Sequence, residues 1–135
     1  MSYKDKNLVT GKKYYYKIKG YKKVGKTTYK GSKSKASKAY PKPAKVKIAS
    51  IKSTAKGAKL YWKKVAGASG YVIYRSESKT GKYTKIKEIK KQTKISYNNT
   101  GLLKGKTYYY KVMAYRNMSG IYVYGKYSIV KQIRK

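Results

Sequence analysis

The sequence predicts an all-β protein built as an antiparallel β-sandwich, with one complete unit preceded by the last three strands of another. Three observations support this prediction: a long internal repeat, a hydrophobic period of two residues, and glycine-rich turns between short apolar runs. No stretch shows the 3.6-residue period of an amphipathic helix. The chain has no Cys, so disulfides cannot stabilise either unit.

The repeat joins residues 2–36 to residues 96–130 at a constant offset of 94 residues, without a gap. Some matches arise by chance in a chain rich in Lys and Tyr, but Leu, Gly and Ser keep the same register. The period is the size of a small domain and exceeds the roughly 20 to 50 residues of solenoid repeats. The identical pairs are Ser2/Ser96, Tyr3/Tyr97, Leu8/Leu102, Gly11/Gly105, Lys12/Lys106, Tyr14/Tyr108, Tyr15/Tyr109, Tyr16/Tyr110, Lys17/Lys111, Tyr21/Tyr115, Gly31/Gly125 and Ser34/Ser128.

A Pro-rich joint completes the division of the chain. Residues 1–40 are expected to be the C-terminal half of a preceding unit, residues 41–43 a linker, and residues 44–135 a complete unit. Pro41 and Pro43 favour an extended, semi-rigid connection. Because segments of about 40 residues rarely bury enough surface to fold alone, the first segment is expected to need a partner, to need completion, or to stay poorly packed.

Alternating side chains mark the strands. In Tyr14–Tyr21 and in Tyr108–Tyr115, the face that begins with the first Tyr is expected to point to the core. Turns at Lys56–Gly57, Gly67–Gly70, Lys79–Gly81, Asn98–Gly101 and Ser119–Gly120 separate the other strands. Those strands are expected at Lys45–Ile51, Ala58–Lys63, Gly70–Arg75, Lys82–Ile89, Thr93–Tyr97 and Ile121–Ile133.

Several of these strands resemble those of a fibronectin type III domain. The resemblance covers residues 44–135. It rests on Leu60-Tyr61-Trp62, on Gly70–Arg75, and on Leu102, Gly105, Tyr108, Tyr110, Val112 and Ala114 in and before the strand at Tyr108–Tyr115. It implies a Greek-key sandwich that serves as a spacer, adhesive or binding unit without catalytic residues. Gly67–Ile86 is especially similar to tandem modules on surface proteins of Gram-positive bacteria. The Arg-Gly-Asp tripeptide of integrin-binding members is absent.

The same resemblance implies roles for individual residues. Trp62 would be the core tryptophan, and the hydroxyl of Tyr108 would close the loop after Leu102. With the strand pattern, this gives an expected core that contains Leu60, Trp62, Tyr71, Ile73, Leu102, Tyr108, Tyr110 and Val112.

Charge is the second strong signal. Thirty-seven basic residues against three acidic ones give a net charge of +34, whereas solubility needs only about 2 to 8 on a small domain. Edge protection of strands explains where many Lys lie but not their excess, for which deliberate supercharging is a rival explanation. Because nearly all are Lys, we expect binding of polyanions without sequence specificity: teichoic acid, glycosaminoglycan or nucleic acid. The candidate contacts are Lys12, Lys13, Lys17, Lys19, Lys22, Lys23, Lys106, Lys111 and Arg116.

Tyrosine is the third signal, with 19 residues and no Phe. The strand alternation predicts that some of these rings face outward. They could stack on sugars or bases, or they could form cross-strand aromatic pairs, which we favour because such pairs commonly stabilise sheets. The candidates for stacking are Tyr15, Tyr21, Tyr109 and Tyr115, and Tyr122 and Tyr124 are also expected to face outward.

Catalysis, a cofactor and a metal site are not expected. The chain has no His and no Cys, and Asp5, Glu77 and Glu88 are too scattered for an acid/base pair. Gly20–Thr27 matches the phosphate-binding loop G-x-x-x-x-G-K-[ST], but that loop must open a helix, and residues 28–39 show strand and turn signals instead. The match is interpreted as chance.

Two functions follow from these patterns. The first is a non-catalytic spacer or adhesion module of a tandem array at the cell surface or outside the cell, bound to polyanions through its Lys. The alternative is a structural subunit of a virion surface or filament, in which a neighbouring chain completes residues 1–40 by strand exchange. Residues 1–20 contain no apolar run of signal-peptide length, and no stretch is apolar enough to span a bilayer.

Overall fold

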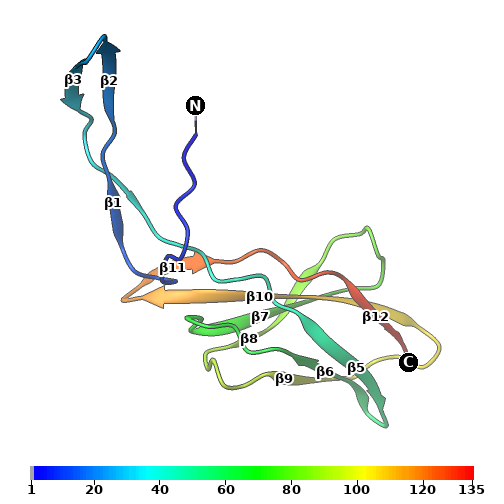
Figure 1. Cartoon of the computed structure of the whole chain (residues 1–135). Coiled ribbons are helices and arrows are strands. Elements are labelled where there is room, and N and C mark those ends of the chain that lie inside the picture. Colours follow the sequence, from blue (N-terminus) through cyan, green and yellow to red (C-terminus); the bar gives the residue numbers. More distant parts are fainter. Residues whose placement is uncertain (1) are drawn as a thin grey trace.

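The computed structural model describes residues 2–135 as strands joined by turns and loops (Figure 1). Met1 lies outside the described residues. Within residues 2–135, no helix is long and apolar enough to cross a membrane. The strands are β1 (Tyr14–Tyr16), β2 (Lys19–Val24), β3 (Thr27–Lys33), β4 (Ser37–Ala39), β5 (Ile48–Thr54), β6 (Gly57–Trp62), β7 (Gly70–Ser76), β8 (Thr84–Ile89), β9 (Ser96–Thr100), β10 (Thr107–Met118), β11 (Ile121–Tyr124) and β12 (Lys131–Arg134).

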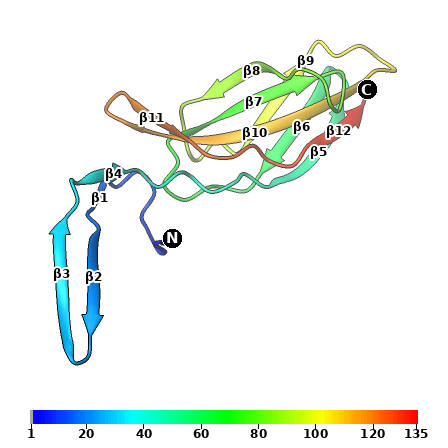
Figure 2. The same ribbon diagram turned by 90° about the horizontal axis from the view of Figure 1, so that it is seen from above.

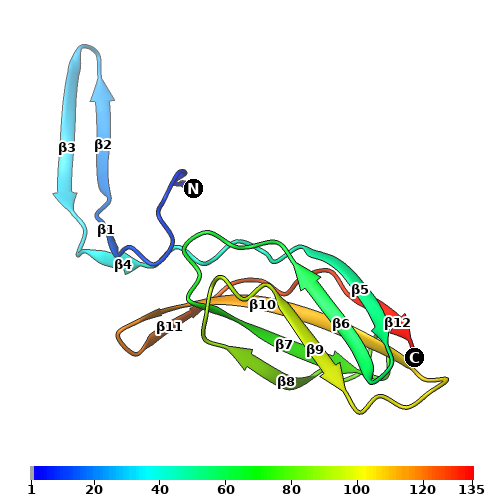
Figure 3. The same cartoon turned by 90° about the horizontal axis from the view of Figure 1, so that it is seen from below.

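Strands β5 to β12 form a sandwich of two antiparallel sheets. One sheet has the order β5-β6-β9, and the other has the order β11-β10-β7-β8 with β12 also paired to β10. Figures 1 and 3 show the two sheets as separate layers, with the long strand β10 running the length of the second one. The predicted fold class, an all-β antiparallel sandwich, is therefore confirmed.

The core lies between these sheets. Leu60, Tyr71, Ile73, Tyr110 and Val112 have no measurable exposure, and the other three expected core residues, Trp62, Leu102 and Tyr108, are also buried. The Trp62 and Tyr71 rings meet edge to face at 5.3 Å. The Tyr71 hydroxyl accepts a hydrogen bond from the Val65 N–H at 3.1 Å and donates one to the Gln92 carbonyl at 3.1 Å, so its buried polar atom is satisfied.

The final strand differs from the expectation. Ile121–Ile133 was predicted as one strand, but the structure has β11 and β12 with an irregular stretch between them. The Ser128 side chain causes this interruption: its hydroxyl accepts the Val112 N–H at 3.0 Å in place of a backbone carbonyl, and the Ser128 N–H donates to the Val112 carbonyl at 2.8 Å. The side chain thus replaces one bond of the ladder and displaces the backbone.

The N-terminal segment repeats the end of the sandwich in three dimensions. Strands β1 and β4 pair, as do β2 and β3, and the registers match β10 with β12 and β10 with β11 at the offset of 94 residues. Ser34 interrupts the ladder as Ser128 does, because its hydroxyl accepts the Ile18 N–H at 2.9 Å. The Tyr14 hydroxyl accepts the Val9 N–H at 3.0 Å, as the Tyr108 hydroxyl accepts the Leu103 N–H at 3.0 Å.

The face of the N-terminal segment that begins with Tyr14, which we call its inner face, was expected to be a core face. The structure contradicts this expectation. Ile18 is 77% exposed, whereas Val112, its equivalent in the sandwich, is fully buried. Tyr14 and Tyr16 are only half-buried, and Gly20 is exposed. The reason is that no described strand covers this face, while the β5-β6-β9 sheet covers the equivalent face of β10.

The buried Tyr110 makes the stability of the sandwich sensitive to alkaline pH. Burial raises the pKa of the Tyr110 hydroxyl from 10.0 to about 12, so the folded chain keeps a proton that the unfolded chain loses near pH 10. This stabilisation is complete below about pH 10 and is lost as the pH rises through about 12. Urea unfolding across that interval should show stability falling less steeply in Tyr110→Phe than in the parent. Lys titration is common to both proteins, so identical slopes would contradict the assignment.

Candidate functional site

The candidate site is the projecting segment of residues 12–39, which we name the lysine hairpin. It contains eleven Lys and no acidic residue, and all eleven Lys are exposed. Figures 1, 2 and 3 show from three directions that β2 and β3 extend away from the sandwich, so both of their faces are open to solvent. With about 3.4 Å per residue, the six residues of β2 make a charged rod about 20 Å long.

Like charges oppose one another within the lysine hairpin. Lys19 lies directly across from Lys33 in the β2–β3 register. Among the described residues, neither ammonium group forms an ion pair with an acidic side chain. Like charges in such a cross-strand pair are destabilising. Every residue of β2 and β3 is exposed, and an isolated two-stranded hairpin is marginal in water. A bound polyanion would reduce this repulsion.

Tyrosine rings accompany the charges on each face of the lysine hairpin. Tyr21 pairs with Lys30 on one face, and Lys22 pairs with Tyr29 on the other. The two rings are 76% and 61% exposed. Each face therefore offers an ammonium group next to a flat apolar ring, the combination that contacts a phosphate and stacks on a base or a sugar.

The base of the lysine hairpin has the same combination. The Nζ atoms of Lys12 and Lys13 lie 5.7 and 5.8 Å from the ring centroids of Tyr14 and Tyr15. Hydrogen bonding to the Tyr15 hydroxyl, with a further contribution from Tyr40, raises the pKa of Lys13 above its usual value. The Tyr14 and Tyr15 rings thus lie beside both ammonium groups.

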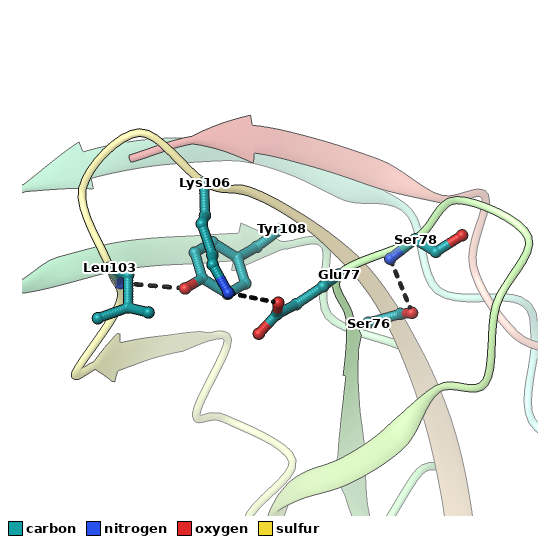
Figure 4. A network of polar contacts seen from close by, with 6 residues as sticks. All are labelled: Ser76, Glu77, Ser78, Leu103, Lys106 and Tyr108. Atoms are coloured by element: carbon teal, nitrogen blue, oxygen red, sulfur yellow. Dashed lines mark hydrogen bonds and ion pairs between the residues drawn. The ribbon is translucent and has the colours of Figure 1, made fainter.

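The other three predicted polyanion contacts lie on the sandwich and already have neighbours. Lys106 forms an ion pair with Glu77 at 3.1 Å (Figure 4), and the Lys111 ammonium lies 3.9 Å from the centroid of the Tyr83 ring. The Arg116 side chain is half-buried against Gly11, where a Cβ would meet its Cγ at 2.7 Å. The structure therefore brings together Lys12, Lys13, Lys17, Lys19, Lys22 and Lys23. Arg116 lies on the sandwich next to the base of the hairpin, and Lys106 and Lys111 lie elsewhere on the sandwich.

The predicted stacking tyrosines also divide. Tyr15 is 64% exposed, and Tyr109 is half-buried. Tyr115 was expected to be exposed, but its exposed fraction is only 2%, so this prediction was wrong. It does lie on the outer face, where Tyr122 and Tyr124 cover it with ring centroids at 5.6 and 6.0 Å. These are the cross-strand aromatic pairs that we favoured over free stacking rings.

Sequence patterns missed part of the lysine hairpin. Five further Lys belong to it but were not among the candidates, because the sequence alone did not show that β3 and its flanking residues project together with β2: Lys26, Lys30, Lys33, Lys35 and Lys38. Their signal was the continuous absence of acidic residues from Lys6 to Ser76. Gly20–Thr27 forms the end of β2 and a tight turn into β3, not the strand-to-helix turn of a phosphate-binding loop.

The arrangement of the two sheets allows the sandwich to be compared with known folds. The sandwich has the fibronectin type III fold, with a three-stranded and a larger sheet and with a Tyr108 hydroxyl that closes the loop before β10 (Figure 4). The chicken CNTN1 FN1-FN3 domains have 20% sequence identity and a TM-score of 0.55, which establishes the fold. The match covers 98% of this chain and 45% of that one, so this chain spans less than half the length of the solved FN1-FN3 chain.

A second solved structure is an Fn3-like protein from Clostridium thermocellum. It has 27% sequence identity and a TM-score of 0.47, and the match covers 65% of this chain and 86% of that one. No protein-family model matches the chain, and no curated protein matches it.

Proposed function

We propose that the protein is a non-catalytic module that binds polyanions through its lysine hairpin, at the cell surface or outside the cell. The observation that carries this proposal is the arrangement of eleven exposed Lys on a projecting segment without an acidic residue. The sandwich would act as the support that presents this segment. The fibronectin type III fold is consistent with a spacer or adhesion role at the surface, since many cell-surface domains share this sandwich architecture.

The chemistry of the hairpin favours charge over sequence as the recognised property. Lys is a compact point charge without the bidentate geometry of Arg, and the lysine hairpin contains no Arg. The ligand class is therefore a flexible or linear polyanion: teichoic acid, a glycosaminoglycan or nucleic acid. Exposed Tyr21 and Tyr29 would add stacking on sugars or bases, at about 1 to 3 kcal/mol for each stacked base.

Binding to teichoic acid, heparin and mixed-sequence DNA across a salt series tests the proposal. Released counterions should make the affinity for each polymer fall steeply with salt, with a slope of about −0.9 per DNA phosphate neutralised. DNAs of different sequence should bind equally well. A flat salt dependence would contradict the proposal, and selection of one neutral glycan would transfer the binding role to the exposed Tyr.

A further inference from the structure

The N-terminal segment has a second open surface, the edge of β1 and β2 on the side away from β4 and β3. In the sandwich, the equivalent edge of β10 pairs with β7 from Tyr109 to Tyr115. Within residues 2–135, no strand pairs with this edge of β1 and β2. The backbone N–H and C=O groups of residues 15–21 that point to this edge are therefore available for strand addition, whereas those of Ile18 bond to Ser34 on the other side.

The inner face beside that edge is largely apolar and only partly covered. Ile18 and Tyr16 occupy the positions of Val112 and Tyr110, which are fully buried in the sandwich. A hollow of about 720 Å³ lies along this face, lined by Tyr3, Leu8, Tyr16 and Ile18 among others. The open edge and the apolar face thus adjoin on one side of the segment.

Residues 2–6 indicate which strands of the sandwich have no counterpart beside the N-terminal segment. Their equivalents, residues 96–100, form β9 because β6 pairs with them. Residues 2–6 form no strand. The part of the sandwich without a counterpart beside the N-terminal segment is therefore β5 to β8, and residues 2–6 could pair once such strands are present.

Asp5 adds a charge requirement. Its carboxylate accepts the Tyr16 hydroxyl at 2.9 Å. In the sandwich, the equivalent Asn99 amide oxygen accepts the Tyr110 hydroxyl at 3.0 Å and also the guanidinium of Arg75, from β7, at 3.3 Å. A strand docked like β7 would place a cation at the Asp5 carboxylate, so two opposite charges would meet where the sandwich has a guanidinium bound to a neutral amide oxygen.

We propose that residues 2–40 are a docking site for a polypeptide with four strands of the β5–β8 pattern. One of these strands, like β7, would pair antiparallel with residues 15–21, cover Tyr16 and Ile18, and direct an Arg to Asp5. The internal duplicate specifies this occupant, since residues 44–95 cover the same surface of the second copy. A second molecule of this chain fits less well, because its own β5–β8 strands are already paired with β9 and β10.

The test is the full chain with a second copy of residues 42–95 placed directly before Ser2. This arrangement gives residues 2–41 the same preceding sequence that residues 96–135 have. Hydrogen exchange of the amides of residues 15–21 should slow at least tenfold relative to the parent, and residues 2–6 should become protected. Exchange at the parent rate in both stretches would overturn the proposal.

Two matched substitutions separate specific docking from nonspecific collapse. Ile18→Lys should remove the protection in the extended chain, because it places a charge in the new core. Tyr15→Lys changes the charge equally but lies on the outer face, so protection should remain. Equal effects of the two would contradict the proposed face. Polyanion binding by the parent does not depend on Ile18, so this proposal and the previous one can fail separately.

Discussion

Replacing Leu60 with alanine is expected to lower the free energy of unfolding of the sandwich by about 2 to 5 kcal/mol. Leu60 lies on β6 at the centre of the core and is fully buried. Alanine would remove the transfer free energy of the lost carbons and leave a cavity that neighbouring β-branched and aromatic residues cannot fill. Urea unfolding followed by the fluorescence of buried Trp62, which the substitution retains, measures the change.

Leu103→Ala is the matched control, because it removes the same atoms from a side chain that is 59% exposed. Its effect should stay within about 0.5 kcal/mol. In a domain of about 90 residues, each kcal/mol corresponds to roughly 4 to 8 °C in Tm, so the two variants should differ clearly in thermal unfolding as well. Similar losses for both would show that the β5-β6-β9 sheet does not cover a common core with β10.

Part of the strand pattern was predictable because β6 and β10 each have one face whose residues are buried at alternate positions. Alternation recovers β6 and the inner face of β10, where Leu60 and Val112 are buried, whereas β7 is a continuous apolar run that is buried on both faces from Tyr71 to Ile73. The offset of 94 residues was equally informative, since it reproduces not only sequence but strand register in the two hairpins. Local periodicity and self-similarity thus predict the elements and their pairing.

Alternation cannot say which outward-facing side chains become covered. Tyr115 points outward as its position predicts, yet Tyr122 and Tyr124 from β11 cover it. Lys111 lies over the ring of Tyr83, which belongs to a loop 28 residues earlier in the chain. Both results depend on contacts between segments that the pattern of a single strand does not contain.

Alternation also cannot say whether an inward-facing side chain becomes covered, as the inner face of the lysine hairpin shows. Ile18 has the sequence environment of a core residue, but a residue becomes buried only when another sheet covers it. The strands that cover Val112 occur once in the 135 residues, and they cover the second copy of the repeat. Identical local patterns therefore lead to opposite burial, with Ile18 at 77% and Val112 at 0% exposure.

Replacing Lys19, Lys22 and Lys23 together with glutamine is expected to weaken polyanion binding about a hundredfold at low salt. A lysine next to an anionic surface contributes about 1 kcal/mol, so three of them contribute about 3 kcal/mol, or roughly two factors of ten in Kd. The slope of log affinity against log salt on DNA should fall by about 3, because each lost phosphate contact removes about one unit. Fluorescence anisotropy of a labelled oligonucleotide across a salt series measures both quantities.

The matched control is the exposed sandwich set Lys63, Lys64 and Lys87, replaced with glutamine in the same way. This variant has the same net charge as the hairpin variant, so a purely global electrostatic effect would weaken both equally. We expect the control to keep most of the parent affinity, because its Lys lie on the sandwich and not on the projecting hairpin. Removing repulsion opposite Lys33 should also stabilise the hairpin of the Lys19 variant, so weaker binding could not be attributed to lost folding. Equal weakening by the two variants would move the binding site from the lysine hairpin to the charge of the whole molecule.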